Sequence, residues 1–252
     1  MANKAEPRPT QRIPAYRTVN SAIGRAIGDY GMIADQDRIL VAVSGGADSL
    51  TLLYMLAERR RWAPVVYHLT AVYVDPGFEP SPAVAVAAFC ERIGVILETV
   101  FTDHGPSAHS SVNRENPCFL CARRRRQTLF EIAADRGYGK LAMGHNQDDI
   151  IETFFMNVLY AGEISTMLPA QPFFGGRFTL IRPLAYAPAQ AVRRLAREIG
   201  VPQMVNPCPS AGTSRRRQVR DLLAGLYREN RKIRGNVFRA LRHVKRENLL
   251  RP

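Results

Sequence analysis

A short apolar run followed by a glycine turn offers a place for phosphate chemistry. Residues 38–43 are typical of a buried strand, and the sequence Ser44-Gly-Gly-Ala-Asp-Ser49 follows them directly. The paired glycines leave backbone N–H groups uncovered, and the two serines add hydroxyl donors. A helix that begins near Asp48 points the positive end of its dipole into the turn, which therefore predicts a polyphosphate ligand.

Three cysteines form a second group with chemical potential. Cys118 and Cys121 stand in a Cys-x-x-Cys spacing that lets both sulfurs reach one metal or cluster, and the arginines of residues 123–126 favour the thiolate. The chain has no second Cys-x-x-Cys, and Cys208 lies in a proline-rich loop that could join the pair. Such a set suits a [4Fe–4S] cluster with one open iron, a three-cysteine zinc site, or a redox pair with a resolving thiol. Cys90, in an apolar stretch, is expected to be a buried hydrophobe.

The elements that must position these groups follow an α/β pattern. Apolar runs alternate with stretches of helical periodicity, which predicts a twisted parallel sheet with helices on both faces, a Rossmann-like fold. Ligands of such sheets bind at the carboxyl ends of the strands, where residues 44–49, Asp75 and residues 144–149 fall. The predicted strands are residues 38–43, 66–74, 94–100, 140–143 and 178–181.

Three segments are expected along the chain. Residues 1–18 are rich in proline and charge, which predicts an N-terminal arm. Residues 19–186 are predicted to form the nucleotide-binding domain that carries the Cys-x-x-Cys. Residues 187–252 predict a helical extension that holds the third cysteine and an RNA-binding surface. Its helices are expected at residues 188–199, 214–227 and 234–248, the last two basic on one side and apolar on the other.

The charge balance indicates a polyanionic partner. The formal net charge is +13, and arginines gather in several runs, which favours nucleic acid. No stretch has the length and hydropathy of a membrane span, and the N-terminus lacks the apolar core of a signal peptide. We therefore expect a cytoplasmic protein without a membrane partner.

Taken in order, these motifs resemble the tRNA 2-thiocytidine synthetase family (TtcA), a branch of the N-type ATP pyrophosphatases that carry a pyrophosphate (PP) loop. The resemblance runs from about residue 20 to residue 245. The segments that carry it are Ser44–Ser49, Cys118–Arg126, Gly144–Asp149, Arg182–Tyr186, and Cys208 with Arg217–Val219.

The resemblance implies a fold like that of the adenine nucleotide alpha hydrolases and an ATP-dependent tRNA sulfurtransferase. Such an enzyme adenylates C2 of a cytidine, expected at position 32 in the anticodon loop, and replaces the oxygen by sulfur. It also implies a [4Fe–4S] cluster on Cys118, Cys121 and Cys208, Mg²⁺ at Asp48 and Asp149, a sulfur donor such as a cysteine desulfurase, and a homodimer. The implied catalytic residues are Asp48, Asp149, Cys118, Cys121 and Cys208. The implied ATP-binding residues are Val43, Ser44, Gly45, Gly46, Asp48, Ser49, Asp75, Arg125, Gly144 and His145.

The sequence departs from the family pattern at three positions. Ala47 replaces the loop lysine, Asn146 replaces a second histidine, and Ala211 stands where many members have another cysteine. Arg125 or Arg126 is expected to supply the charge that the lysine would bring.

Three alternatives remain open. Sulfur transfer could proceed through a cysteine persulfide in place of a cluster. The outcome could be 2-thiouridine formation or another adenylation such as lysidine synthesis. A chain that has lost the loop lysine could also be a non-catalytic RNA-binding or iron–sulfur sensing protein.

Overall fold

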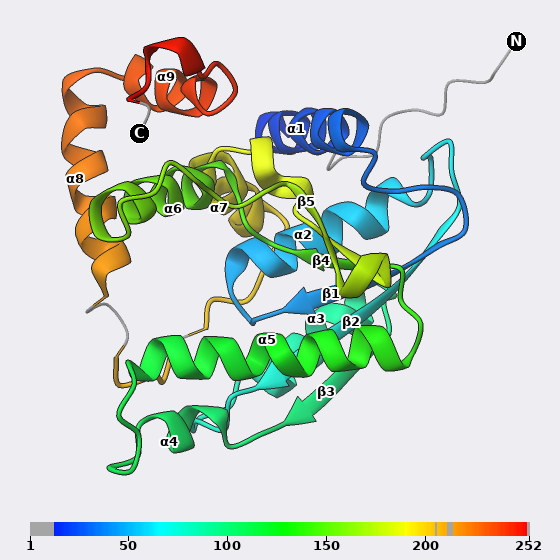
Figure 1. Ribbon diagram of the computed structural model, residues 1–252. Coiled ribbons are helices and arrows are strands. Elements are labelled where there is room, and N and C mark those ends of the chain that lie inside the picture. The colour runs from blue at the N-terminus through cyan, green and yellow to red at the C-terminus, as the bar shows by residue number, and fades with distance from the viewer. Residues whose placement is uncertain (1–12, 205, 211–213, 251–252) are drawn as a thin grey trace, which may run out of the picture. The chain divides into compact units, whose positions relative to one another are not determined.

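The computed structural model describes residues 13–204, 206–210 and 214–250 (Figure 1). They form two compact units. The first contains the described residues up to Asn146 together with residues 168–210, and the second contains residues 147–167 and 214–250.

The first unit is built on a six-stranded sheet with the order β3-β2-β1-β4-β6-β5. Its strands are β1 (Asp37–Val43), β2 (Tyr67–Asp75), β3 (Leu97–Phe101), β4 (Lys140–Met143), β5 (Ala170–Phe173) and β6 (Phe178–Ile181). All neighbours are parallel except β5, which runs antiparallel to β6 at the edge. In the centre, Val41 of β1 is in register with Ala71 and Ala142. The predicted α/β fold with a mostly parallel sheet is confirmed.

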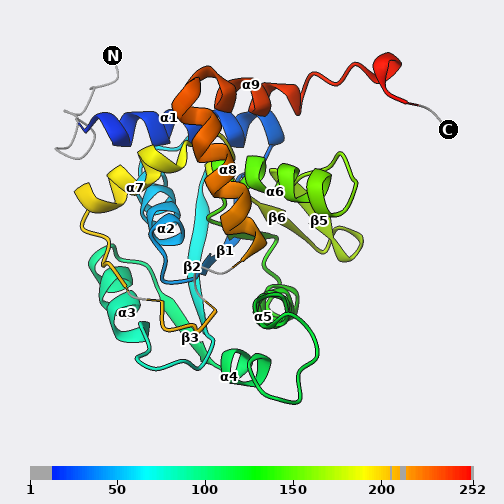
Figure 2. The same cartoon turned by 90° about the vertical axis from the view of Figure 1, so that its left-hand side faces the viewer.

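Helices cover both faces of this sheet. They are α1 (Pro14–Tyr30), α2 (Ala47–Arg59), α3 (Ala83–Arg92), α4 (His104–Ala108), α5 (Pro117–Asp135) and α7 (Ala189–Glu198), with the 3-10 turns η2 (Phe174–Gly176) and η3 (Pro183–Tyr186). Helices α2 and α3 lie on one side of the sheet and α5 on the other (Figure 2). Leu129 and Ala133 of α5 pack on Leu40, Val72 and other apolar side chains of the strands. This burial fixes α5, and with it the Cys-x-x-Cys at its start, on the sheet.

The ends of the predicted domains differ from the observed units. Helix α1 begins at Pro14, so residues 14–18 of the predicted arm are helical, while residues 1–12 lie outside the described residues. Buried apolar side chains such as Val19 and Ile23 explain why α1 packs on the first unit. Helix α7, predicted as part of the extension, also belongs to the first unit, where it packs on α1 and α2.

The second unit gathers α6 (Gln147–Tyr160), α8 (Arg215–Glu229), α9 (Lys232–Ala240) and the 3-10 turn η4 (Arg246–Asn248). Its small core contains Ile151 of α6 and Val219 and Leu223 of α8, with Val237 and Phe238 of α9 beside them. The predicted helix over 234–248 was wrong in extent, since α9 ends at Ala240. Beyond Leu241 the described side chains are exposed, so no packing stabilises further helix.

The strand β5 was not predicted, because it has only four residues and contains a proline, which is tolerated at a sheet edge. No helix among the described residues combines the length and hydropathy needed to cross a membrane.

Candidate functional site

The turn between β1 and α2 is shaped by serine hydroxyls and one left-handed glycine. Ser44 N–H donates to Ser49 Oγ at 3.1 Å, and Ser49 Oγ donates to the Gly46 carbonyl at 2.9 Å. Gly46 N–H in turn donates to Ser44 Oγ at 3.3 Å. Gly45 has φ +81°, a conformation that favours glycine. The turn follows buried Val43, and Gly46 at the N-cap of α2 makes no side-chain capping hydrogen bond, which suits the start of the helix to an anion.

Gly144 lets β4 approach this turn closely. A Cβ at Gly144 would lie 2.8 Å from Ser49 Cα and 2.9 Å from Ser49 N. Both are backbone atoms at the start of α2, which cannot move aside as the end of a flexible side chain does. The predicted Gly144 is therefore required by the packing of the chain against the first turn of α2.

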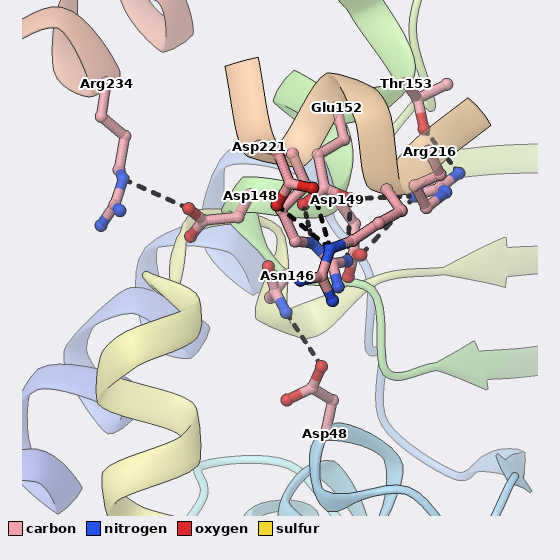
Figure 3. A network of polar contacts seen from close by, with 11 residues as sticks. Asp48, Asn146, Asp148, Asp149, Glu152, Thr153, Arg216, Asp221 and Arg234 are labelled. Atoms are coloured by element: carbon pink, nitrogen blue, oxygen red, sulfur yellow. Dashed lines mark hydrogen bonds and ion pairs between the residues drawn. The ribbon is translucent and has the colours of Figure 1, made fainter. Parts of the chain in front are cut away.

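Asp48 lies on the first turn of α2 and has a partner that follows β4. Asn146 Nδ2 donates to Asp48 Oδ2 at 3.0 Å (Figure 3). Asn146 is 3% exposed, so this hydrogen bond lies in a nearly dry environment where it restricts the carboxylate. Asn146, which stands where the family pattern has a histidine, thus places a neutral hydrogen-bond donor beside Asp48.

His145 is held by a buried arginine. Arg182 Nε donates to His145 Nδ1 at 3.3 Å, and because a guanidinium only donates, the imidazole hydrogen is on Nε2 when the ring is neutral. Burial lowers the pKa of Arg182 to about 10, and the nearby charge of Arg126 acts in the same direction. Arg182 also donates to the Leu168 carbonyl, which anchors it to the loop before β5.

Asp75 ends β2 and is almost fully buried. Its Oδ1 accepts from Gly77 N–H at 2.8 Å, its Oδ2 accepts from the Ser81 hydroxyl, and its carbonyl accepts from Thr102. The carboxylate thus organises the loop after β2. Its predicted contact with ATP stays a prediction.

A cavity of about 280 Å³ opens beside the glycine turn, within the first unit. Its walls include Gly45, Gly46 and Ala47 on one side and Arg193 and Arg197 of α7 on the other. Both arginines are exposed, and neither was predicted as a site residue from the sequence. In the sequence, they stand out only as basic residues of a helix that was predicted to belong to the extension.

The three candidate cysteines are half-buried and lie in the first unit. Cys118 and Cys121 are three residues apart on α5, so they share one face of the helix. Burial raises the pKa of the Cys121 thiol, Arg125 opposes the shift, and Cys208 and Cys118 add to it. This influence indicates that Cys118 and Cys208 each lie near Cys121. Among the described residues, however, no three His, Cys, Asp or Glu side chains converge tightly enough to hold a single metal ion.

His109 adds a contact to this group that the sequence analysis missed. Its Nδ1 lies 2.9 Å from the Gly105 carbonyl, which only accepts, so Nδ1 carries the hydrogen. Its Nε2 lies 2.7 Å from Ser210 Oγ and 3.9 Å from Cys208 Sγ. The ring also packs edge-on against Phe78 at 5.5 Å between centroids. His109 therefore ties the loop of Cys208 to α4.

Arg125 lies on α5 one turn beyond Cys121. Its Nε is buried and has no hydrogen-bond partner within the described ranges. The positive charge of Arg125 acts to lower the pKa of the Cys121 thiol and that of the Tyr73 hydroxyl on β2. The structure thus places Arg125 near the cysteines, and its predicted contact with ATP phosphates stays a prediction.

The carboxylates after His145 belong to the second unit, where arginines surround them. Arg234 Nε lies 3.2 Å from Asp148 Oδ1, and Arg216 Nη1 lies 3.6 Å from Asp149 Oδ1 (Figure 3). Arg220 contacts buried Glu152 through two nitrogens, at 2.7 and 3.0 Å. Asp48 and Asp149 belong to different units, so their shared magnesium site stays a prediction.

Comparison with known proteins places this arrangement in a family. The PP-loop domain family matches residues 15–225. A tRNA-cytidine(32) 2-sulfurtransferase from Geobacter sulfurreducens is 37% identical over 238 residues, which are 93% of this chain and 93% of the relative. The chain belongs to the tRNA-cytidine(32) 2-sulfurtransferase family. A second family member, from Geobacter metallireducens, is 36% identical over 244 residues, again 93% of each chain.

A solved structure shares the fold of this 2-sulfurtransferase family member. It is the U34-tRNA thiolase NcsA from Methanococcus maripaludis with its [4Fe-4S] cluster, which has a TM-score of 0.76 and 24% identity to this chain. The superposition covers 92% of this chain and 80% of NcsA. The resemblance to 2-thiocytidine synthetases, predicted from the motifs, is confirmed by the comparisons of sequence.

Proposed function

We propose that this chain is an ATP-dependent tRNA sulfurtransferase that converts a cytidine, at position 32 of the anticodon loop, to 2-thiocytidine. One observation carries the proposal. This chain is a member of the 2-sulfurtransferase family, and one compact unit contains both the glycine turn after β1 and the three cysteines. Two of these, Cys118 and Cys121, lie on α5, and Cys208 lies near Cys121. Nucleotide activation and sulfur transfer need both groups.

ATP would place its phosphates at the turn between β1 and α2. The N–H groups at the start of α2 offer donors to phosphate oxygens. Ala47 provides no charge, and we assign that role to Arg193 and Arg197, whose side chains line the cavity beside the turn. Arginine binds phosphate through a planar fork of donors, so two of them can replace one lysine.

Magnesium would bind Asp48, whose carboxylate Asn146 holds in place, and Asp149 is the proposed further ligand or base. Carboxylate oxygens are the ligands that Mg²⁺ prefers, and the ion, when bound, would supply positive charge to the phosphates. The role of Asp48 would thus be to hold the cation whose charge favours the departure of pyrophosphate.

The reaction would proceed in two displacements. The C2 oxygen of the cytidine attacks the α-phosphorus of ATP, the bond to the β-phosphate breaks, and pyrophosphate leaves. A sulfur nucleophile then attacks C2, and AMP leaves with the former C2 oxygen. Adenylation is needed because that oxygen is by itself a poor leaving group.

The donor set fits a [4Fe–4S] cluster on Cys118, Cys121 and Cys208. In a cluster each thiolate binds a different iron, so the sulfurs need to be neighbours but do not converge on one ion. Arg125 and Arg124 favour the thiolate form of Cys121 against the effect of burial. When bound, the cluster would supply the sulfur that replaces the C2 oxygen.

The tRNA backbone would bind the basic helices of the second unit. The exposed arginines of α8, of α9 and of the turn between them include Arg215, Arg217, Arg228, Arg231 and Arg239. Phosphate contacts of this kind supply sequence-independent affinity that falls with salt. A cysteine desulfurase as sulfur source, a homodimer and a cytoplasmic location complete the proposal.

The deciding experiment is anaerobic turnover with the purified full chain after cluster reconstitution. ATP, Mg²⁺, sulfide and a tRNA with cytidine at position 32 are supplied, and released pyrophosphate and digested nucleosides are quantified. We expect pyrophosphate and 2-thiocytidine in equal amounts, with both lost when position 32 is uridine. Cys118→Ala is expected to abolish 2-thiocytidine and the iron–sulfur absorption, while Cys90→Ala keeps both.

The products also separate the alternatives. Thiouridine or lysidine among the nucleosides would replace the proposed substrate, and turnover by an iron-free protein would favour the persulfide route. Absence of tRNA-dependent pyrophosphate release would contradict an enzymatic function and favour a binding protein.

A further inference from the structure

A second hollow lies on the first unit, along α5. It has a volume of about 540 Å³ and lies between α5 and the turn that joins β5 to β6. The residues of α5 that line it recur every three or four positions, so they form one stripe of the helix. This stripe comprises Arg123, Arg126, Gln127, Phe130, Glu131, Ala134 and Asp135, and the opposite wall comprises Phe174 and Arg177. We call this hollow the Phe174 pocket.

Phe174 presents an aromatic ring to solvent at a cost in backbone strain. Its φ is +50°, a left-handed conformation that a bulky residue rarely adopts, and its side chain is 60% exposed. Neither the hydrophobic effect nor backbone preference accounts for a phenylalanine here. Gly175 and Gly176 next to it also have positive φ and carry no side chain that covers the ring.

Neighbouring aromatic rings hold Phe174 in place. Phe130 packs edge-on against it at 6.2 Å, and Phe178, which is fully buried, lies at 5.8 Å between centroids. Phe130 also contacts Phe173 and Phe178, so the cluster is continuous with the core of the unit. One side of the Phe174 ring is thus supported by rigid neighbours while the rest remains open, as in a platform for stacking.

Three arginines line the pocket together with the carboxylates of Glu131 and Asp135, which leaves a small excess of positive charge for an anionic ligand with a flat ring. Arg126 and Arg177 are exposed, and neither pairs with a carboxylate in the part of the chain that the structure describes. Arg123 forms an exposed ion pair with Glu115, which a phosphate could replace at little cost. An aromatic platform bordered by arginines is the combination that binds single-stranded nucleic acid, with bases on the ring and phosphates on the guanidinium groups.

We propose that the Phe174 pocket binds an unstacked base of the RNA substrate, with Phe174 as the stacking surface and Arg126 and Arg177 as contacts to the flanking phosphates. The inference rests on the proposed function and specifies how the substrate is held. The pocket and the cysteines lie on opposite sides of α5, because Cys121 and Phe130 are nine residues apart, about 14 Å along the helix axis and about half a turn around it. The pocket would therefore hold a nucleotide on the far side of the helix from the base that reacts.

The test is a binding measurement without ATP, so that it does not depend on catalysis. Fluorescence anisotropy would compare the full chain bound to an anticodon stem-loop RNA and to a fully paired duplex of equal length. We expect wild-type protein to prefer the stem-loop and Phe174→Ala to weaken its binding about 5- to 100-fold, the effect of one stacked base. Binding of the duplex is expected to change little.

Matched variants separate stacking from charge and from folding. Phe174→Trp keeps an aromatic surface and should preserve affinity, whereas Phe174→Leu keeps apolar bulk and should lose it. Arg177→Gln should lower the slope of log affinity against log salt by about one, which Phe174→Ala leaves unchanged. Phe101→Ala, at an exposed phenylalanine of β3, serves as the control and should bind as wild type does.

Two results would overturn the proposal. Equal binding of stem-loop RNA by wild type, Phe174→Ala and Phe174→Leu would exclude stacking at this pocket. A Phe174→Ala protein with normal RNA affinity but altered sedimentation would assign the pocket to contact with a second copy of the chain. If wild-type protein binds the stem-loop in this manner but forms no 2-thiocytidine, the proposed function fails and the RNA pocket stands.

Discussion

Asn146, which follows β4, donates a hydrogen bond to Asp48 Oδ2 on the first turn of α2, at 3.0 Å. The contact joins residues 98 positions apart at the carboxyl edge of the sheet. It gives the Asp48 carboxylate a fixed orientation beside the glycine turn, so the side chain would not have to be ordered when a ligand binds.

Asn146→Ala is therefore expected to weaken Mg²⁺-dependent ATP binding and to destabilise the fold. Loss of a hydrogen bond to a charged group costs about 1.5–3 kcal/mol, which corresponds to roughly 10- to 100-fold if the cost falls on the bound state. Calorimetric titration with ATP and Mg²⁺, together with urea unfolding, would measure both effects. Asn157→Ala, which removes amide contacts to exposed Ser165, is the control, and equal affinities of the two variants would contradict the role of Asn146.

Arg193→Gln and Arg197→Gln are each expected to weaken ATP binding about 10-fold, because each removes a charge-assisted contact to phosphate. The affinity for adenosine, which has no phosphates, should change little. The neighbouring Arg194→Gln offers a matched control, since Arg194 pairs with Glu198 and does not line the cavity beside the turn. If all three variants bind ATP equally, the phosphates are held by other residues.

Gly144→Ala is expected to lower the free energy of unfolding by about 1–3 kcal/mol, the usual cost of forcing extra atoms into a packed region. The added Cβ would lie within 3.0 Å of backbone atoms of Ser49 and Asp48, so ATP binding should fall as well. Gly139→Ala is the comparison, because a Cβ there meets nothing within 4 Å. Similar unfolding curves for the two variants would show that the turn can move away from β4.

His109→Ala is expected to release the loop of Cys208 and raise the alkylation rate of that thiol. The loss of one neutral hydrogen bond, about 0.5–1.5 kcal/mol, predicts an increase of roughly 2- to 10-fold. Iodoacetamide labelling of the cluster-free protein, followed by peptide mass spectrometry, gives the rate for each cysteine. His68→Ala, at an exposed histidine of β2, should leave the rate unchanged, and an unchanged rate in His109→Ala would exclude the tether.

Cys90 provides a pH-dependent prediction. Burial raises the pKa of its thiol to about 11, because the thiolate is poorly solvated in the apolar core. The folded protein therefore binds this proton more tightly than the unfolded chain does, so the associated stability is complete below pH 9 and is lost as the pH rises towards 11. Urea unfolding from pH 8 to 11 should show a smaller alkaline loss in Cys90→Ala than in wild type. Equal losses would indicate that Cys90 does not titrate in this range.

Local sequence patterns determined the parallel strands, the phosphate-binding turn and the Cys-x-x-Cys at the start of α5. Each of these depends on residues that are close in the chain: a strand on a run of apolar side chains, the turn on adjacent glycines, the paired thiols on a spacing of three. The family resemblance followed from the same short motifs in their order. It also implied the ligand set and the substrate, which stay proposals.

Tertiary structure decided what depends on contacts between distant segments. His109 is 99 residues from Cys208, and the arginines of α7 reach the turn only because α7 packs on α2. The edge strand β5 forms because β6 offers its free backbone groups, and the exposure of Phe174 depends on the turn that follows β5. No local pattern encodes these relationships, since burial and pairing are set by which surfaces meet when the whole chain folds.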